Sequence, residues 1–220
     1  LNNGSPFTGS RWSANGTSIY YNTGNVGIGT TMPTEALEVG GNIKATGNSF
    51  MFGPGAIASG GSSFAAGTSA SASQYGIAFG YDASAGDRGV AIGYESISGY
   101  RGVSIGYNSR QIGAGNDRVI VGSSNSISEY AYRSVLVGYG NTLSGSDVVG
   151  LGSYLKVGSN ILIGKGFDGT YPLESPASSI GFAFGSNIPT MIITQGAFNS
   201  SGNVGIGTTS PGAKLDVNGS

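Results

Sequence analysis

The chain has 220 residues, of which 42 are glycine, and its net charge is −1 with only 10% charged residues. This composition is typical of a turn-dense all-β chain, and the 7 prolines and the lack of a strict third-residue glycine period exclude collagen. The absence of cysteine excludes disulfides and thiolate metal sites, and the absence of histidine excludes a histidine base. The chain has no apolar run long enough to span a membrane and no basic block that would indicate a nucleic-acid partner. We also predict no metal and no cofactor.

Residues 1–50 are predicted to form a short β shaft segment. A polar stretch that holds the single tryptophan, Trp12, is followed by the strand-like run SIYY at 18–21. Residues 24–31 then read GNVGIGTT and lead through a proline turn into the run LEV at 37–39. We expect a strand, a Thr-Thr-x-Pro turn and a second strand, with glycines on one face that let backbones approach closely.

Residues 51–185 repeat one phrase, which is an apolar residue, any residue, an apolar residue and then glycine. Its clear copies lie at 77–80, 90–93, 103–106, 119–122, 135–138, 149–152 and 161–164. Fainter copies lie at 64–67 and 182–185. The glycines of the clear copies are 13, 13, 16, 16, 14 and 12 residues apart, a spacing that suits one turn of a β-solenoid. The sequence therefore predicts an all-β, parallel β-solenoid of about nine coils.

Each coil is expected to contain two short strands and two corners. Because side chains alternate along a strand, the first and third residues of the phrase share a face, and we expect that face to point inward. The glycine closes the strand where the chain turns with positive φ or passes too close to a neighbour for a Cβ. A second strand, such as 81–85, and a polar corner, such as 86–89, complete the coil. The resulting core is thin, which favours burial of a further face against identical chains.

Four tyrosines directly follow the phrase glycine in different coils and are expected to stack as a ladder along one edge: Tyr81, Tyr94, Tyr107 and Tyr139. Sugars pack on aromatic faces, so Tyr94, Tyr107 and Tyr139 are candidate receptor-binding residues. The alternative is that neighbouring rings only cover each other and shield the corner.

Uneven coil lengths indicate loops, and loops on a rigid scaffold are the usual place for recognition. Extra residues fall at 110–118 and 129–133, and the longest insertion is the loop 165–179. This loop supplies the remaining candidate receptor-binding residues, namely Phe167, Asp168, Tyr171 and Glu174. The alternative is a plain loop that caps the solenoid and hides its edge strands.

Charged residues gather in the polar corners. Arginines lie in successive corners with acids nearby and are expected to form an exposed row of ion pairs, or alternatively to contact an anionic polysaccharide: Arg88, Arg101, Arg118 and Arg133. The 11 acidic residues are scattered over the corners, so no catalytic residue is predicted and we expect no enzyme.

Residues 186–220 are predicted to form a second β shaft segment. A strand is expected at 189–194, and the phrase GNVGIGTT returns at 202–209. A proline and the run LDV at 215–217 follow at the same offsets as in the first segment. In both copies the asparagine of the phrase, Asn25 or Asn203, is expected to be a turn amide. The alternative is that these asparagines surround a threefold axis and hold an ion.

Two resemblances follow from these motifs. The stretch from 19 to 47 resembles the shaft segments of bacteriophage tail fibres and tailspikes, in which this phrase commonly precedes an intramolecular chaperone domain of the endosialidase type. The coil phrases at 89–93 (GVAIG) and 102–106 (GVSIG) are similar to head repeats of trimeric autotransporter adhesins. This second resemblance implies a left-handed parallel β-roll and an intertwined homotrimer. Together the resemblances cover nearly the whole chain except 165–179 and 186–199.

The resemblances imply a structural and receptor-binding segment of a trimeric fibre from a phage tail or a phage-like particle. Such a segment belongs to the virion tail fibre or the outside of an extracellular particle, joins other tail or baseplate proteins, and contacts a bacterial surface glycan or an outer-membrane protein. Three identical chains, and several fibres per particle, multiply each weak contact. The alternatives are a trimeric adhesin on the bacterial cell surface and a tailspike that depolymerises polysaccharide.

Overall fold

The computed structural model describes residues 13–15, 18–20, 24–42, 49–113, 115–158, 161–166, 173–174, 179–184, 189–194 and 202–218. These residues form short strands and turns without a helix, which confirms the predicted all-β class. The described part therefore contains no helix that could cross a membrane. The chain divides into two compact units, Leu1–Thr46 and Gly47–Ser220.

The first unit contains two pairs of short strands. Strand β1 (Ser13–Asn15) pairs with β2 (Ser18–Tyr20) in antiparallel fashion, and β3 (Val26–Ile28) pairs with β4 (Leu37–Val39) in parallel. The turn between β3 and β4 is held by the amide of Asn25, which donates to the carbonyl oxygen of Pro33 at 2.9 Å. The predicted strand, proline turn and second strand are thus confirmed.

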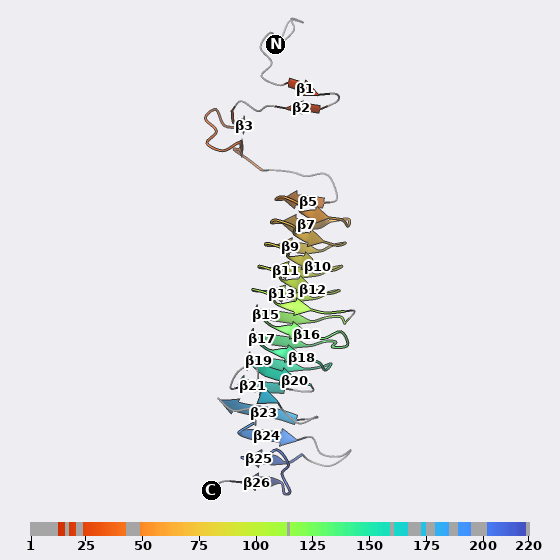
Figure 1. Cartoon of the computed structure of the whole chain (residues 1–220), viewed down its shortest axis with the longest axis vertical. Helices are drawn as coiled ribbons and strands as arrows, with labels where there is room; N and C mark the ends of the chain where they lie inside the picture. The colour runs from red at the N-terminus through yellow and green to blue at the C-terminus, as the bar shows by residue number, and fades with distance from the viewer. Residues whose placement is uncertain are drawn as a thin grey trace, which may run out of the picture. The chain divides into compact units, whose positions relative to one another are not determined.

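The second unit is a parallel β-solenoid of about eleven turns, compared with the nine coils counted from the phrase (Figure 1). Each turn, called a rung below, contributes one strand to each of two sheets. The rungs contribute the following stacked strands to the long sheet: β5 (Ser49–Phe52), β7 (Ser63–Ala66), β9 (Ile77–Phe79), β11 (Val90–Ile92), β13 (Val103–Ile105), β15 (Val119–Ser123), β17 (Val135–Tyr139), β19 (Val149–Ser153), β21 (Ile161–Lys165) and β23 (Ser179–Phe184).

The short sheet stacks the second strand of each rung. Its members are β6 (Ile57–Ala58), β8 (Ser71–Ala72), β10 (Ser84–Ala85), β12 (Ile97–Ser98), β14 (Arg110–Gln111), β16 (Ser126–Ile127), β18 (Thr142–Leu143), β20 (Leu155–Val157) and β22 (Leu173–Glu174). All neighbouring pairs in this sheet are parallel. Most of these strands have two residues, so the predicted second strand is shorter than the alternating run that indicated it.

The second shaft segment continues the long sheet at its C-terminal end (Figure 1). Strand β24 (Met191–Thr194) is antiparallel to both β23 and β25 (Val204–Ile206), and β26 (Leu215–Val217) is parallel to β25. The strand expected at 189–194 is therefore confirmed. The unit boundary after Thr46 lies near the predicted shaft boundary at residue 50, whereas the segment from 186 onward shares a compact unit with the solenoid.

A column of glycines lies at the C-terminal ends of the long-sheet strands, either directly after the strand or as its next-to-last residue. These residues have φ angles between 107° and 147°: Gly53, Gly67, Gly80, Gly93, Gly106, Gly122, Gly138, Gly152 and Gly164. At Gly106, where φ is 131°, a Cβ would also overlap the carbonyl oxygen of Gly122 in the next rung. Both predicted reasons for glycine, positive φ and close approach of the backbone, are thus confirmed.

The orientation of the phrase is the reverse of the one expected. The middle residue points into the coil, and Ala78, Ala91 and Leu136 have no exposed surface. The first and third residues point outward, so that Ile77 is 43% and Phe79 is 55% exposed. The expectation of inward first and third residues was wrong because the interior of such a short coil is too narrow for two large side chains from one strand.

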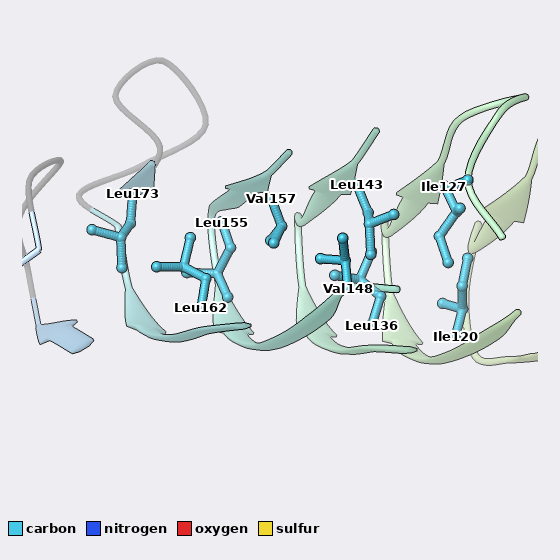
Figure 2. Packing of buried hydrophobic residues seen from close by; sticks show 10 residues of the cluster. Ile120, Ile127, Leu136, Leu143, Val148, Leu155, Val157, Leu162 and Leu173 are labelled. Carbon is cyan, nitrogen blue, oxygen red and sulfur yellow. The ribbon is translucent and has the colours of Figure 1, made fainter. Parts of the chain in front are cut away.

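The core has two parts that differ in side-chain size. Between residues 65 and 91 it consists of alanines, including Ala65, Ala78 and Ala91. Between residues 120 and 173 it consists mainly of isoleucine, leucine and valine, which point into the interior from both sheets in Figure 2. The side chains become larger where the spacing of the phrase glycines increases, after Gly106.

A polar layer separates these two parts. Gln111 is buried and its amide nitrogen donates to the carbonyl oxygens of Val103 and Arg118 at 2.6 and 3.0 Å. Arg118 is fully buried, and its guanidinium donates to the carbonyl oxygens of residues 112, 113 and 128 at 2.9 to 3.1 Å. Burial lowers the pKa of the Arg118 guanidinium. The prediction that Arg118 belongs to an exposed row was therefore wrong, because this residue turns inward to satisfy the carbonyls of the longer corner.

Candidate functional site

An apolar surface runs along the solenoid on the outer stripe, which we define as the first and third residues of the seven clear phrases. The members of the stripe are aliphatic apart from Phe79, and none is charged. Ile92, Ile105, Val121 and Leu151 remain 36–37% exposed. The outward side chains of the short sheet are mostly polar instead, and include Ser71, Ser84, Arg110, Ser126, Thr142, Lys156 and Glu174. One face of the solenoid is thus apolar and the opposite face polar.

A tyrosine ladder lies at the corner that follows the glycine column. The rings of Tyr81 and Tyr94 stack with their centroids 5.0 Å apart, and those of Tyr94 and Tyr107 stack at 5.2 Å. The interplanar angles are 9° and 12°, so the rings cover each other's faces. A hydrogen bond to the carboxylate of Glu95, together with its charge, raises the pKa of the Tyr94 phenol.

The ladder is interrupted at the next rung. Ser123 pairs in register with Tyr139, and the amide of Ser124 donates to the carbonyl oxygen of Tyr107 at 2.8 Å. Ser123 therefore occupies the ladder position between the rungs of Tyr107 and Tyr139. Tyr139 instead meets the ring of Tyr154 edge-on, with centroids 5.4 Å apart and an angle of 89°. The predicted ladder is confirmed for its first three tyrosines and wrong for Tyr139, which a serine rung separates from them.

The loop predicted to bind a receptor is described only at one candidate residue. Phe167, Asp168 and Tyr171 lie outside the described residues. Glu174 lies in β22, where its side chain is exposed and accepts a hydrogen bond from Lys156 Nζ at 2.9 Å. Glu174 is thus a strand residue of the polar face, while the recognition role of the loop remains a prediction.

Charged and aromatic side chains form a second column at the opposite corner. Arg101 pairs with Asp117 at 2.6 Å, and Arg133 pairs with Asp147 at 2.6 Å, so the predicted ion pairs between rungs exist at these two arginines. Arg88 makes no such pair. Its guanidinium instead donates to the hydroxyl of Tyr100 at 2.7 Å and lies 5.7 Å from the ring centroid of Tyr75. All these groups are exposed or half-exposed.

Asp147 does not have the electrostatics of a general acid. The hydrogen bond from Arg133 holds the pKa of Asp147 below its ordinary value, whereas a general acid for glycoside cleavage needs a raised pKa. In the described part of the chain, no three acidic side chains gather closely enough to hold a metal ion.

The shaft repeats also carry exposed apolar side chains. Asn203 donates to the carbonyl oxygen of Pro211 at 3.2 Å, as Asn25 does to Pro33, so both phrase asparagines are turn amides as predicted. Ile28 is 56% exposed and its counterpart Ile206 is 39% exposed. The two repeats therefore share one structure and leave the same kind of surface uncovered.

Two features of the surface escaped the sequence reasoning. The outer stripe was assigned to the interior. The sequence held a contrary signal, since the middle residue of the phrase varies between alanine, serine, glycine, isoleucine and leucine while the first residue is always valine or isoleucine. The break in the tyrosine ladder is also visible in the sequence, where serine replaces tyrosine after Gly122. Comparisons with protein-family models, curated proteins and solved structures found no match to this chain.

Proposed function

We propose that the chain is a structural and receptor-binding segment of a homotrimeric fibre that attaches a phage or phage-like particle to a bacterial surface. The observation that carries the proposal is the outer stripe, an aliphatic surface that runs along the solenoid while its interior changes. Monomeric soluble proteins rarely expose a contiguous apolar patch larger than about 300–600 Å². Two apolar side chains per rung over seven successive rungs therefore indicate a surface that is covered by a partner.

The spacing of the stripe supports a partner that is another copy of the chain. The stripe repeats its apolar pairs once per rung, at the interstrand spacing of about 4.8 Å. A second solenoid with the same rung spacing matches this repeat along its whole length, which a globular partner does not. The absence of charge on the stripe agrees with burial at the core of an interface.

The shaft repeats support the same partner. Leu37 is 59% exposed in the first repeat, and its counterpart Leu215 is 62% exposed in the second. Two repeats in different compact units leave the same side chains uncovered, and three identical chains side by side would cover both repeats and the stripe with one arrangement. The number three and the left-handed coil come from the resemblance to phage fibres and trimeric adhesins. Multivalent contact with the host follows from the three identical sides.

The assembly is tested by the mass of the purified chain in solution. We expect a species of three times 21.9 kDa in sedimentation equilibrium or light scattering. The double variant Ile92→Lys with Ile105→Lys places charge on the stripe and should dissociate the trimer or leave it unfolded. The matched control is Ser71→Lys with Ser84→Lys on the polar face of the short sheet, which should remain trimeric. A folded monomer for the unsubstituted chain would overturn the proposal.

The attachment role is tested with bacterial cells and isolated surface polysaccharide. The labelled trimer should bind cells of a susceptible strain and compete with whole particles for them. Polysaccharide incubated with the trimer should keep its chain length, because we propose binding without cleavage. Steady release of shortened glycan would establish a depolymerising tailspike in place of a binding fibre.

A further inference from the structure

We propose that the break in the tyrosine ladder at Ser123 is a binding site for one uncharged pyranose ring of a surface glycan. The inference rests on the proposed attachment function and names the ligand class and the place where it binds. The site, called the ladder gap below, consists of the ladder position of Ser123 together with Tyr107 on one side and Tyr139 on the other.

The hydrogen-bond register defines the ladder gap. In the rungs before it, the amide that follows each ladder residue donates to the carbonyl of the ladder residue one rung earlier, as Asn108 does to Tyr94 at 2.8 Å. Ser124 continues this pattern to Tyr107, and Gly140 continues it to Ser123 at 3.0 Å. Ser123 thus places a hydroxymethyl group between the phenol rings of Tyr107 and Tyr139, and Ser153 places another at the ladder position of the rung after Tyr139.

The uncovered face of Tyr107 opens toward this rung. Tyr94 is covered by a ring on both faces and is 43% exposed, whereas Tyr107 is covered on one face and is 56% exposed. Among the residues that the structure describes, no aromatic ring stacks on the other face of Tyr107. Within the ladder, only the edges of the stacked tyrosine rings are accessible to a ligand. The gap, in contrast, leaves one whole ring face of Tyr107 accessible.

The width of the gap suits one ring. Tyr107 and Tyr139 lie two rungs apart, which corresponds to about 9.6 Å at the spacing of parallel strands. A ring that stacks on the open face of Tyr107 at the ladder spacing of 5.0–5.2 Å would occupy the rung of Ser123, and the rung of Tyr139 would bound it on the far side. A second ring does not fit between them at this spacing, so the site takes a single residue of a glycan.

The side chains around the gap favour an uncharged sugar. The three positions that follow the ladder residues here are Asn108, Ser124 and Gly140, whereas Asp82 and Glu95 stand at the same positions in the earlier rungs. Amide and hydroxyl groups donate to and accept from sugar hydroxyls without selecting a charge. An aromatic side chain of a protein partner would stack equally well, but it would form no hydrogen bonds with these polar groups. We therefore favour the sugar.

The test fills the gap with the ring that is missing. Ser123→Tyr completes the ladder, and tyrosine is already accommodated at this position in four other rungs, so the variant should fold and assemble as before. The probes are methyl glycosides of glucose, galactose, mannose and N-acetylglucosamine, with glucuronate and sialic acid as charged comparators, observed by saturation-transfer NMR. We expect at least one neutral glycoside to bind, and Ser123→Tyr to weaken it about tenfold or more, which is about 1.4 kcal/mol.

Two further variants separate the gap from the rest of the ladder. Tyr107→Ala removes one side of the gap and should also abolish binding, while Tyr81→Ala removes the far end of the ladder and should leave binding within about twofold. Equal binding by Ser123→Tyr and the unsubstituted chain, or binding of the charged comparators alone, would overturn the inference. So would binding of aromatic peptides but no glycoside. If the trimer still attaches to cells in any of these cases, only the ladder gap is rejected and the attachment function stands.

Discussion

The two halves of the solenoid core differ in nearly every inward position, yet they present the same outer stripe. In the N-terminal half the middle residues of the phrase are alanine or serine, and in the C-terminal half they are isoleucine, leucine or glycine. The first residue of every clear phrase is valine or isoleucine, regardless of what lies inside. A position that stays aliphatic while its interior neighbours change is constrained from outside the coil.

The comparison also concerns the lengths of the rungs. The glycine spacing rises from 13 to 16 residues where the core changes from alanine to isoleucine and leucine, and these longer rungs also enclose Asn125 and Asn141. The spacing falls again to 12 residues around Leu155, Val157 and Leu162, so the size of the core side chains alone does not set the rung length. The amides of these two asparagines donate to phrase-glycine carbonyl oxygens of the next rung at 2.7 and 2.8 Å. The larger core is thus accompanied by a hydrogen-bonded ladder that the alanine half lacks.

The largest effect is expected where the two halves share a constraint. Gly106→Ala places a Cβ against the carbonyl oxygen of Gly122 and forces alanine to a φ of 131°, and should cost more than about 3 kcal/mol of unfolding free energy. The matched control is Gly61→Ala, because no atom lies within 4 Å of a Cβ built there. Urea denaturation at fixed protein concentration measures both. Equal midpoints for the two variants would show that the glycine column is not a stacking constraint.

The next effect is expected in the leucine half of the core. Leu136→Ala should lower the unfolding free energy by about 2–5 kcal/mol, through lost transfer energy and the cavity that remains. A value in the upper part of this range is expected, because Leu136 also fills the space beside Gly150, where a Cβ would come within 2.7 Å of its Cδ1. A loss below about 1 kcal/mol in urea denaturation would mean that the rungs collapse around the cavity.

The converse substitution tests the alanine half. Ala78 occupies the same rung position as Leu136 and packs among other alanines with no exposed surface. Ala78→Leu should therefore overpack its short coil and cost about 1–3 kcal/mol, with a fall in the urea midpoint. Unchanged stability would show that the alanine half has room for a larger inward side chain.

Much of this fold was predictable, because its signals are local and repeated. The glycine spacing predicted the parallel solenoid, and the recurring octapeptide at 24–31 and 202–209 predicted two identical strand-turn-strand segments. Which residues of the phrase point inward was predicted wrongly. Alternation alone does not show which side of a strand faces the core when the residues on both sides are apolar. The contrast between alanine at position 78 and leucine at position 136 indicates the inward side, since the middle position varies with the core while the first position stays valine or isoleucine.

Single departures from the repeat were harder to predict than the repeat itself. Arg118 stands where the preceding rungs have Gly89 and Gly102, one position after the exposed arginines Arg88 and Arg101. Its place in a corner was evident from the sequence, but its inward direction was not. It turns inward because the longer rung leaves carbonyl oxygens at 112 and 113 that need donors. Such a demand arises only once the rungs are stacked.

A moderate effect is expected at this junction. Arg118→Met removes the donors that satisfy buried carbonyl oxygens and should lower the unfolding free energy by about 1–3 kcal/mol. This loss is expected even though the substitution also removes a buried charge and a buried Nε that has no hydrogen-bond partner. Arg118→Lys keeps the charge without the three-way geometry and should also be destabilised. The measurement is again the urea midpoint. A methionine variant at least as stable as the parent chain would mean that the burial of the cation costs more than its hydrogen bonds contribute.

The smallest effect is expected at the exposed corner column, which both halves share. Asp147 accepts from Arg133, and its folded pKa lies below the ordinary value of 3.8. The contribution of the pair is therefore present above that value and is lost as the pH falls through the lower folded pKa. Because both side chains are more than half exposed, solvent screens the pair, and Asp147→Asn should leave the melting temperature at pH 7 nearly unchanged. Between pH 5 and pH 3 the variant should lose slightly less stability than the parent chain, because it has one fewer carboxylate to protonate; a steeper loss in the variant would contradict the ion-pair assignment.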